Sequence, residues 1–192
     1  MSRTKVKQNL IDASFGNILE QLVFIADGSS ITTNRGTITA PNATSAQVQN
    51  STSFADITGT DIAYLPPVGS TRVVYECEWT LGYNSSPHPM PHIQILLDGT
   101  VINHSRYTHY NGGNSGPYDD KITNRAIIII NSGAPDDIAN GKLNAWSSNK
   151  TIKMQGANWN GHNFYYHYMY HWNNNTSTRP IIQPTIKLTA YS

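Results

Sequence analysis

Histidines are the residues of this chain best suited to chemistry, as metal ligands or proton carriers. His88 and His92 in "PHPMPH" have the spacing of a helical zinc pair, but the surrounding prolines exclude that helix. His167 and His171 in "FYYHYMYHW" also lie four positions apart. In an extended strand that spacing is about 13 Å, too long for one shared ion. A metal site would have to be assembled across strands or subunits, so we expect hydrogen-bonded histidines, no metal and no cofactor.

Other catalytic patterns are weak. Ser115 in "GGNSGPY" has the glycine frame of a serine nucleophile loop, but no second motif accompanies it. Asp119–Asp120 and Asp136–Asp137 lack the ligand spacing of a calcium loop, so solvated loop charge is the preferred interpretation. The chain has no nucleophile elbow, phosphate loop, dinucleotide fingerprint or Cys-x-x-Cys motif. We therefore expect that the protein is not an enzyme. A hydrolase would need perturbed acids or histidines gathered in one cleft.

Aromatic residues offer a different chemistry. Tyrosine and tryptophan rings beside asparagine, glycine and aspartate are what a sugar-binding site requires. Four such aromatics fall in or beside segments that are rich in asparagine and glycine, and we expect them in surface loops that bind a ligand: Tyr107, Tyr110, Tyr118 and Trp159. A receptor-binding or carbohydrate-binding module is therefore one interpretation of the chain.

The length, composition and charge of the chain indicate what kind of fold positions these residues and which partners it excludes. The chain has 192 residues, of which 38% are hydrophobic and 13% charged, which is typical of a folded domain. A net charge of +1 gives no positive field for a nucleic acid, so we expect none as a partner. One cysteine excludes an intrachain disulfide, and without an N-terminal secretory signal we expect synthesis in a cytoplasm. No apolar run is long enough to span a bilayer, so we expect no membrane insertion.

Short alternating segments, separated by Gly, Pro, Asn and Asp, follow from residue 30 onward. This pattern predicts about eight to ten strands and an all-β, antiparallel jelly-roll sandwich. "TRVVYECEWTLGY" places Cys77 on an apolar face, as a buried and inert thiol. Asp98-Gly99, between two apolar runs, predicts a type I′ hairpin. The connection at residues 133–148 has helical character near "DDIANGKL".

Residues 164–172, "FYYHYMYHW", are predicted to form a strand with large side chains on both faces. Phe164, Tyr166 and Tyr168 belong to one face, and His167 and Met169 to the other. A strand covered on both faces needs two burial partners. In a chain of this size, the second partner is commonly another copy of the same chain.

The N-terminal region, residues 1–28, lies before the β pattern and is predicted to be a short helix or an extended anchor arm, followed by the sandwich at residues 29–192. Its apolar residues need a surface to cover them on a partner or on neighbouring subunits. The predicted anchor residues are Val6, Leu10, Phe15, Ile18, Leu19 and Leu22.

Several segments together resemble a family of small virion structural proteins of marine tailed phages and other aquatic viruses: "MSRTKVKQNLIDASFGNILEQ", "ITGTDIAYLPPVGSTRVVYECEW", "NAWSSNKTIKMQ" and "QPTIKLTAYS". The resemblance implies a trimeric jelly roll of the tumour-necrosis-factor or C1q kind. It implies capsid decoration or a fibre knob, with the N-terminal arm attached to capsid, portal or fibre proteins. It also implies a virion protein that is made in the host cytoplasm and exposes its loops to a host glycan or receptor.

In that assembly one face of residues 164–172 fills the sandwich, and the other packs at or near the three-fold contact. The residues expected at the trimer interface are Tyr166, Tyr168, Tyr170, His167 and His171. This strand and "GYNSSPHPMPH" are richer in histidine and tyrosine than we expect of the family, which leaves a special local function open.

Overall fold

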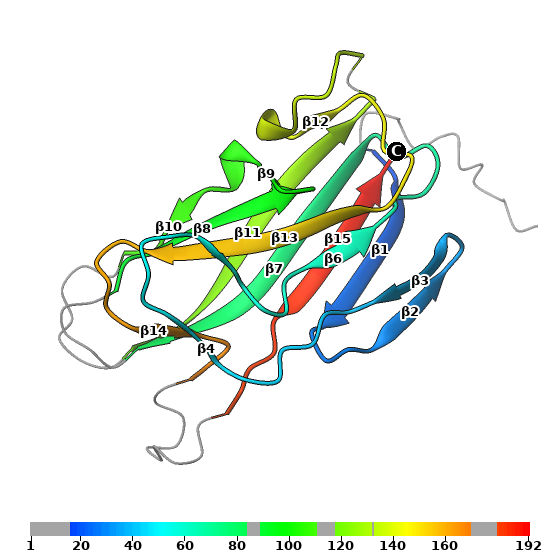
Figure 1. The fold of residues 1–192 in the computed structure, drawn as a ribbon. Coiled ribbons are helices and arrows are strands. Elements are labelled where there is room, and N and C mark those ends of the chain that lie inside the picture. Colours follow the sequence, from blue (N-terminus) through cyan, green and yellow to red (C-terminus); the bar gives the residue numbers. More distant parts are fainter. Residues whose placement is uncertain (1–15, 84–88, 111–117, 132, 170–179) are drawn as a thin grey trace, which may run out of the picture.

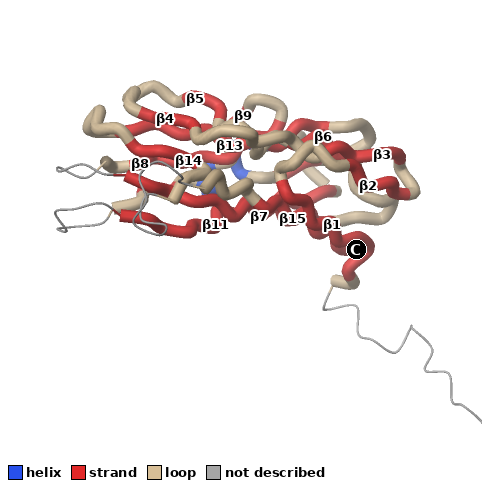
Figure 2. Tube along the Cα trace, turned by 90° about the horizontal axis from the view of Figure 1, so that it is seen from below, coloured by secondary structure: helices blue, strands red, loops and turns tan. Residues whose placement is uncertain are grey.

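The protein is a sandwich of two β-sheets packed face to face (Figures 1 and 2). The computed structural model describes residues 16–83, 89–110, 118–131, 133–169 and 180–192. Figure 2 views the two layers from the side, with β1, β15, β7 and β11 in one layer and β13, β5 and β6 in the other.

The first sheet has seven strands. Its main path runs β1–β15–β7–β11–β12, while β14 pairs with both β7 and β4. The pairing is antiparallel except between β11 and the short β12. The strands are β1 (Ile18–Ile25), β4 (Gln47–Gln49), β7 (Arg72–Tyr83), β11 (Tyr118–Ile130), β12 (Lys142–Leu143), β14 (Phe164–Tyr166) and β15 (Thr185–Tyr191).

The second sheet has six strands in the path β10–β8–β13–β5, with β6 also on β13 and β9 on β8. A separate hairpin and two short 3-10 helices complete the described chain. These elements are β2 (Ser30–Thr33), β3 (Gly36–Thr39), β5 (Ala55–Asp56), β6 (Ile62–Tyr64), β8 (Pro91–Leu97), β9 (Thr100–Val101), η2 (Asn103–Ser105), β10 (Tyr107–Thr108), η3 (Ile138–Asn140) and β13 (Lys150–Asn158).

The chain crosses between the sheets repeatedly, which makes the fold a jelly roll. β1 lies in the first sheet, β5 and β6 in the second, β7 in the first, and β8 to β10 in the second. β11, β13 and β15 then alternate between the first, second and first sheets. The predicted all-β, antiparallel jelly-roll sandwich is therefore confirmed.

Alternation along β7 builds the core, as predicted. Tyr75, Cys77 and Trp79 are fully buried between the sheets, whereas the residues between them lie on the outer face and are partly exposed. Their polar atoms find partners inside: the Trp79 indole donates to Asn124 Oδ1 at 2.9 Å, and the Tyr75 hydroxyl donates to the Thr60 carbonyl at 2.7 Å. These bonds offset the cost of burying polar groups.

The Asp98-Gly99 hairpin is confirmed. Both residues have positive φ, 47° and 82°, as a type I′ turn requires, and they join β8 to β9. The Asp98 carboxylate accepts from the Thr151 amide at 2.8 Å and from Lys150 Nζ at 2.9 Å. The turn is thereby tied to the beginning of β13.

Three predicted segments have different boundaries. Residues 18–25 belong to the sheet as edge strand β1, and not to an arm, because they pair with β15 along its length. β1 and β15 lie side by side in Figure 1. The strand predicted over 164–172 ends at Tyr166, because His167 adopts a positive φ of 62°. The helical character expected near residues 136–143 is limited to η3.

Within the described residues, no helix has the length and apolar character needed to cross a membrane.

Candidate functional site

A shallow hollow lies on the outer surface of the second sheet, where β8 and β10 meet the segment before β5. Its volume is about 200 Å³. We call it the aromatic groove, and its lining residues are Phe54, His92, Ile93, Arg106, Tyr107 and Thr108. Strand pairing assembles it: Tyr107 and Thr108 lie opposite Ile93 and His92, and His92 lies opposite Ala157 of β13.

Two exposed aromatic rings stand beside His92: Phe54 is 45% exposed and Trp159 68%. Tyr107, which is 43% exposed, lies opposite the inward-facing Ile93, so its ring projects from the other face of β10. The Trp159 indole stands edge-on to the His92 imidazole, with 5.9 Å between ring centroids. Tyr110 is also 68% exposed and follows β10 by two residues. Large apolar rings gathered at one surface indicate a binding function more strongly than isolated exposed residues do.

The groove also holds polar groups that can bind a ligand. His92 Nδ1 and Thr108 Oγ1 are hydrogen-bonded at 2.8 Å. His92 Nε2 is shielded from solvent, and no partner for it is found among the described residues. The exposed Arg106 guanidinium at the rim makes no ion pair within the described part of the chain.

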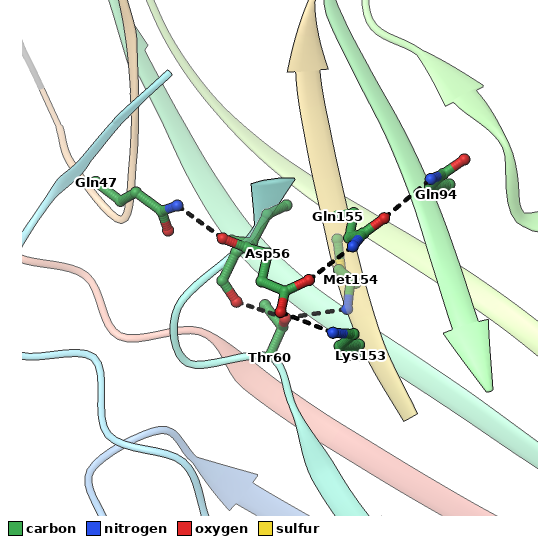
Figure 3. Close-up of polar contacts among 8 residues, drawn as sticks. Gln47, Asp56, Thr60, Gln94, Lys153, Met154 and Gln155 are labelled. Atoms are coloured by element: carbon green, nitrogen blue, oxygen red, sulfur yellow. Dashed lines mark hydrogen bonds and ion pairs between the residues drawn. The ribbon is translucent and has the colours of Figure 1, made fainter. Parts of the chain in front are cut away.

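A row of hydrogen-bonded side chains crosses the same face next to the groove (Figure 3). Gln94 donates to Gln155 at 3.1 Å, and Gln155 donates to the Asp56 carboxylate at 2.8 Å. Lys153 Nζ contacts the other carboxylate oxygen at 2.7 Å. These bonds lower the pKa of Asp56 and keep it ionised at neutral pH. The row presents fixed amide groups beside the aromatic rings.

His109 lies between the groove and the beginning of β11. Its Nδ1 is 3.3 Å from the Tyr107 hydroxyl, and its Nε2 is 3.5 Å from Asp120 Oδ2. Burial lowers the pKa of His109, although the Asp120 charge acts in the opposite direction. His109 is therefore mainly neutral at pH 7 and helps to orient Tyr107.

The outward face of the first sheet is a second, flatter surface. Its exposed apolar residues stand on the two outer strands of the β1–β15–β7–β11 path: Ile18, Val23 and Ile25 on β1, and Ile129 on β11. We call this surface the β1–β11 face. Its charges are largely paired, with Lys187 Nζ 3.0 Å from Glu76 and Lys121 Nζ 2.5 Å from Glu78. Arg72 lies 4.4 Å from the centre of the Tyr191 ring.

Two of the residues predicted at the trimer interface lie in the core of the sandwich. Tyr166 and His167 are fully buried in their own chain, so they offer no surface to another subunit. Tyr166 faces inward beside Trp79, and the His167 imidazole bonds the Thr58 carbonyl at 2.7 Å. Tyr168 is partly exposed and packs on Tyr165. Tyr170 and His171 lie outside the described residues.

Some of the predicted anchor and ligand-loop residues are exposed as expected, whereas others are buried or lie outside the described residues. Ile18 and Leu19 are exposed on β1, whereas Leu22 packs against the core. Val6, Leu10 and Phe15 lie outside the described residues. Of the predicted ligand-loop residues, Tyr107 lines the groove and Trp159 contacts His92 beside it. Tyr110 is exposed two residues after β10, and Tyr118 begins β11 with its side chain outside the described residues.

Sequence reasoning does not predict Phe54, His92, Arg106 and Thr108 as one site. No local pattern joins them, because strand register across β5, β13, β8 and β10 brings them together. A metal site does not emerge: the described residues contain no group of three or more His, Cys, Asp or Glu arranged to hold an ion.

Comparison with known proteins leaves the family open. No protein-family model matches the chain, and no curated protein matches it in sequence. Among solved structures, one similar fold is the CBM36-1 domain of a multidomain xylanase from the hindgut metagenome of Trinervitermes trinervoides. Identity is 12%, the match covers 88% of this chain and 96% of that domain, and the TM-score is 0.33.

Infectious bursal disease virus provides two further similar structures. Its Gx strain structure has 11% identity over 91% of this chain, with a TM-score of 0.37. Its VP2 subviral particle has 11% identity over 85% of this chain, with a TM-score of 0.33. The chain spans 37% and 38% of the length of those two proteins. Such low scores carry no functional argument.

Proposed function

We propose that this chain is a non-enzymatic structural protein of a virus particle, which assembles as a homotrimer through the β1–β11 face and decorates a capsid or forms a fibre knob. Support comes from the jelly-roll fold and from the sequence resemblance to virion proteins. In this assembly the segment before β1 attaches the trimer to other virion proteins, such as capsid, portal or fibre proteins.

The β1–β11 face is the observation that carries the proposal. Val23 and Ile25 are each 53% exposed on β1, and Ile129 is 38% exposed on β11. β1 is also an edge strand, and an exposed apolar edge strand is an aggregation hazard unless something covers it. A second copy of the chain would bury these residues and remove the hazard.

Paired charges make this face suitable for self-association. Lys187–Glu76 and Lys121–Glu78 already satisfy one another within a chain, so burial of the face would leave few uncompensated charges. Flat apolar area with internally paired charge is compatible with an interface core between identical subunits.

Solution mass of the full chain tests the assembly. We expect a trimer by light scattering, and monomers for Val23→Asp and Ile129→Asp at unchanged secondary structure. Val68→Asp is the matched control, because Val68 is 85% exposed on the loop between β6 and β7 and belongs to neither outer strand of the sheet. A wild-type monomer at all concentrations, or a Val23→Asp trimer, contradicts the proposal.

A second candidate function is host attachment through a receptor- or carbohydrate-binding module, which the aromatic groove favours. The two functions are separable. Substitutions in the groove should change attachment but not mass, and substitutions on the β1–β11 face should change mass first.

A further inference from the structure

We propose that the aromatic groove binds one ring of a glycan that carries a carboxylate, with Trp159 and Phe54 as stacking surfaces and Arg106 as the partner of the carboxylate. This inference deepens the attachment function proposed above and rests on it. It is independent of trimer formation, because the groove lies on the second sheet and the β1–β11 face on the first.

The size and lining of the groove fit a single ring. Its volume of about 200 Å³ is smaller than the pockets of about 300–1,000 Å³ that enclose drug-sized ligands. An open hollow of this size can hold one unit of a longer chain whose other units remain outside. Both faces of a pyranose ring present C–H groups, which pack on aromatic rings such as Trp159 and Phe54.

Hydroxyl groups of the ring require polar partners, and the groove provides them in fixed positions. His92 is held by Thr108 at 2.8 Å, which leaves Nε2 shielded and without a partner in the described chain. A buried polar atom without a partner is costly and uncommon. The exposed Thr108 hydroxyl, which lines the groove beside His92, is the group that a ligand hydroxyl can reach. Gln94 and Gln155 offer further amide groups along the same face.

Charge around the groove selects the ligand class. Lys153 Nζ already forms an ion pair with the Asp56 carboxylate at 2.7 Å, so it is not available to bind a ligand carboxylate. Arg106 is exposed and lines both the aromatic groove and an adjoining hollow of about 250 Å³. It makes no ion pair with an acidic side chain among the described residues. A guanidinium binds a carboxylate through two parallel hydrogen bonds, which favours an acidic sugar over a neutral one.

Binding of defined glycans to the full-length protein tests the inference. The probes are oligogalacturonate and sialyllactose, each compared with its own methyl ester, which keeps the shape and removes the charge. We expect at least one acid to bind at least tenfold more tightly than its ester, and this preference to weaken as salt rises. Arg106→Gln should abolish the preference, and Trp159→Ala should reduce binding of acid and ester alike by at least tenfold.

Matched controls separate the groove from general effects. Arg35→Gln removes an exposed arginine from the β2–β3 turn, and Val68→Ala trims an exposed apolar side chain far from the groove, so both should bind as wild type does. Equal affinity for acids and esters would overturn the charge assignment. No binding to any probe by a protein of native mass would overturn the glycan site and leave the proposed assembly standing.

Discussion

The Tyr166 hydroxyl, which comes from the first sheet, lies directly over the backbone of Gly156 in the second. Tyr166 crosses the core beside Trp79, with 5.1 Å between ring centroids, and its ring reaches β13 at the one position where a side chain is absent. A β-carbon built on Gly156 would overlap the hydroxyl oxygen and lie 2.8 Å from Tyr166 Cζ. The glycine therefore sets how closely the two sheets approach at this point.

Substitution of Gly156 by alanine should destabilise the fold, because the added methyl group collides with the Tyr166 ring. Overpacking of this kind typically costs about 1–3 kcal/mol. Tyr166→Phe removes the closest atom but not Cζ, so Gly156→Ala should cost less when it is combined with Tyr166→Phe than when it is made alone. Chemical denaturation of both single variants and the double variant measures this coupling. Additive losses would show that the two residues do not limit the sheet spacing.

Tyr166→Phe alone should leave stability unchanged or raise it by up to about 1 kcal/mol, because the buried hydroxyl has no hydrogen-bond partner in the described chain. Tyr75→Phe is the matched comparison. Tyr75 is equally buried, but its hydroxyl donates to the Thr60 carbonyl at 2.7 Å, so the same change should cost about 1 kcal/mol. In thermal denaturation, Tyr75→Phe should lower the melting temperature, whereas Tyr166→Phe should raise it or leave it unchanged. A larger loss for Tyr166→Phe would mean that its hydroxyl is satisfied.

Acidification should weaken the fold through His167. Burial lowers the pKa of His167 below its usual 6.5, while its bond to the Thr58 carbonyl acts in the opposite direction. Above pH 6.5 the ring is neutral in both the folded and unfolded chain. As pH falls through 6.5, the unfolded chain takes up the proton first, so the free energy of unfolding decreases until the folded pKa is reached.

His167→Asn tests this, since asparagine tolerates the positive φ of 62° at this position and does not titrate. The variant should be less stable than wild type at pH 7.5 and lose less stability between pH 7.5 and 5.5. His109, whose pKa is also lowered by burial, contributes in the same window, and His109→Gln measures its share. An unchanged slope in His167→Asn would exclude His167 as the source.

Fold class can be predicted because strand alternation is a local property of the chain. β7 places Tyr75, Cys77 and Trp79 inward, and this order is visible in the sequence. β1 is harder to predict, because "ILEQLVFI" has apolar residues on both faces and fits a helical row as well as a strand. Its partner β15 lies at the other end of the chain, and only that pairing decides the conformation.

The candidate site can be predicted only in part. Tyr107 and Trp159 are predicted because aromatic residues among glycine and asparagine favour ligand loops, but the sequence presents His92 only as a potential metal ligand. Its role depends on Thr108 and Ala157, which strand register places beside it. Likewise, nothing in "FYYHYMYHW" predicts that His167 turns into the left-handed region and ends the strand. Nonlocal contacts decide both features.

Cys77 should be chemically silent while the protein is folded. The thiol lies on the inward face of β7 with no exposed surface, and burial raises its pKa to about 12. Since the thiolate is the reactive species, almost none is present at pH 8, and reagents cannot reach it. Iodoacetamide should leave the native protein unmodified and alkylate one site in denaturant, as mass spectrometry can measure. Labelling of the native protein faster than global unfolding would show that the sandwich opens locally at β7, which would contradict its position in the centre of the core.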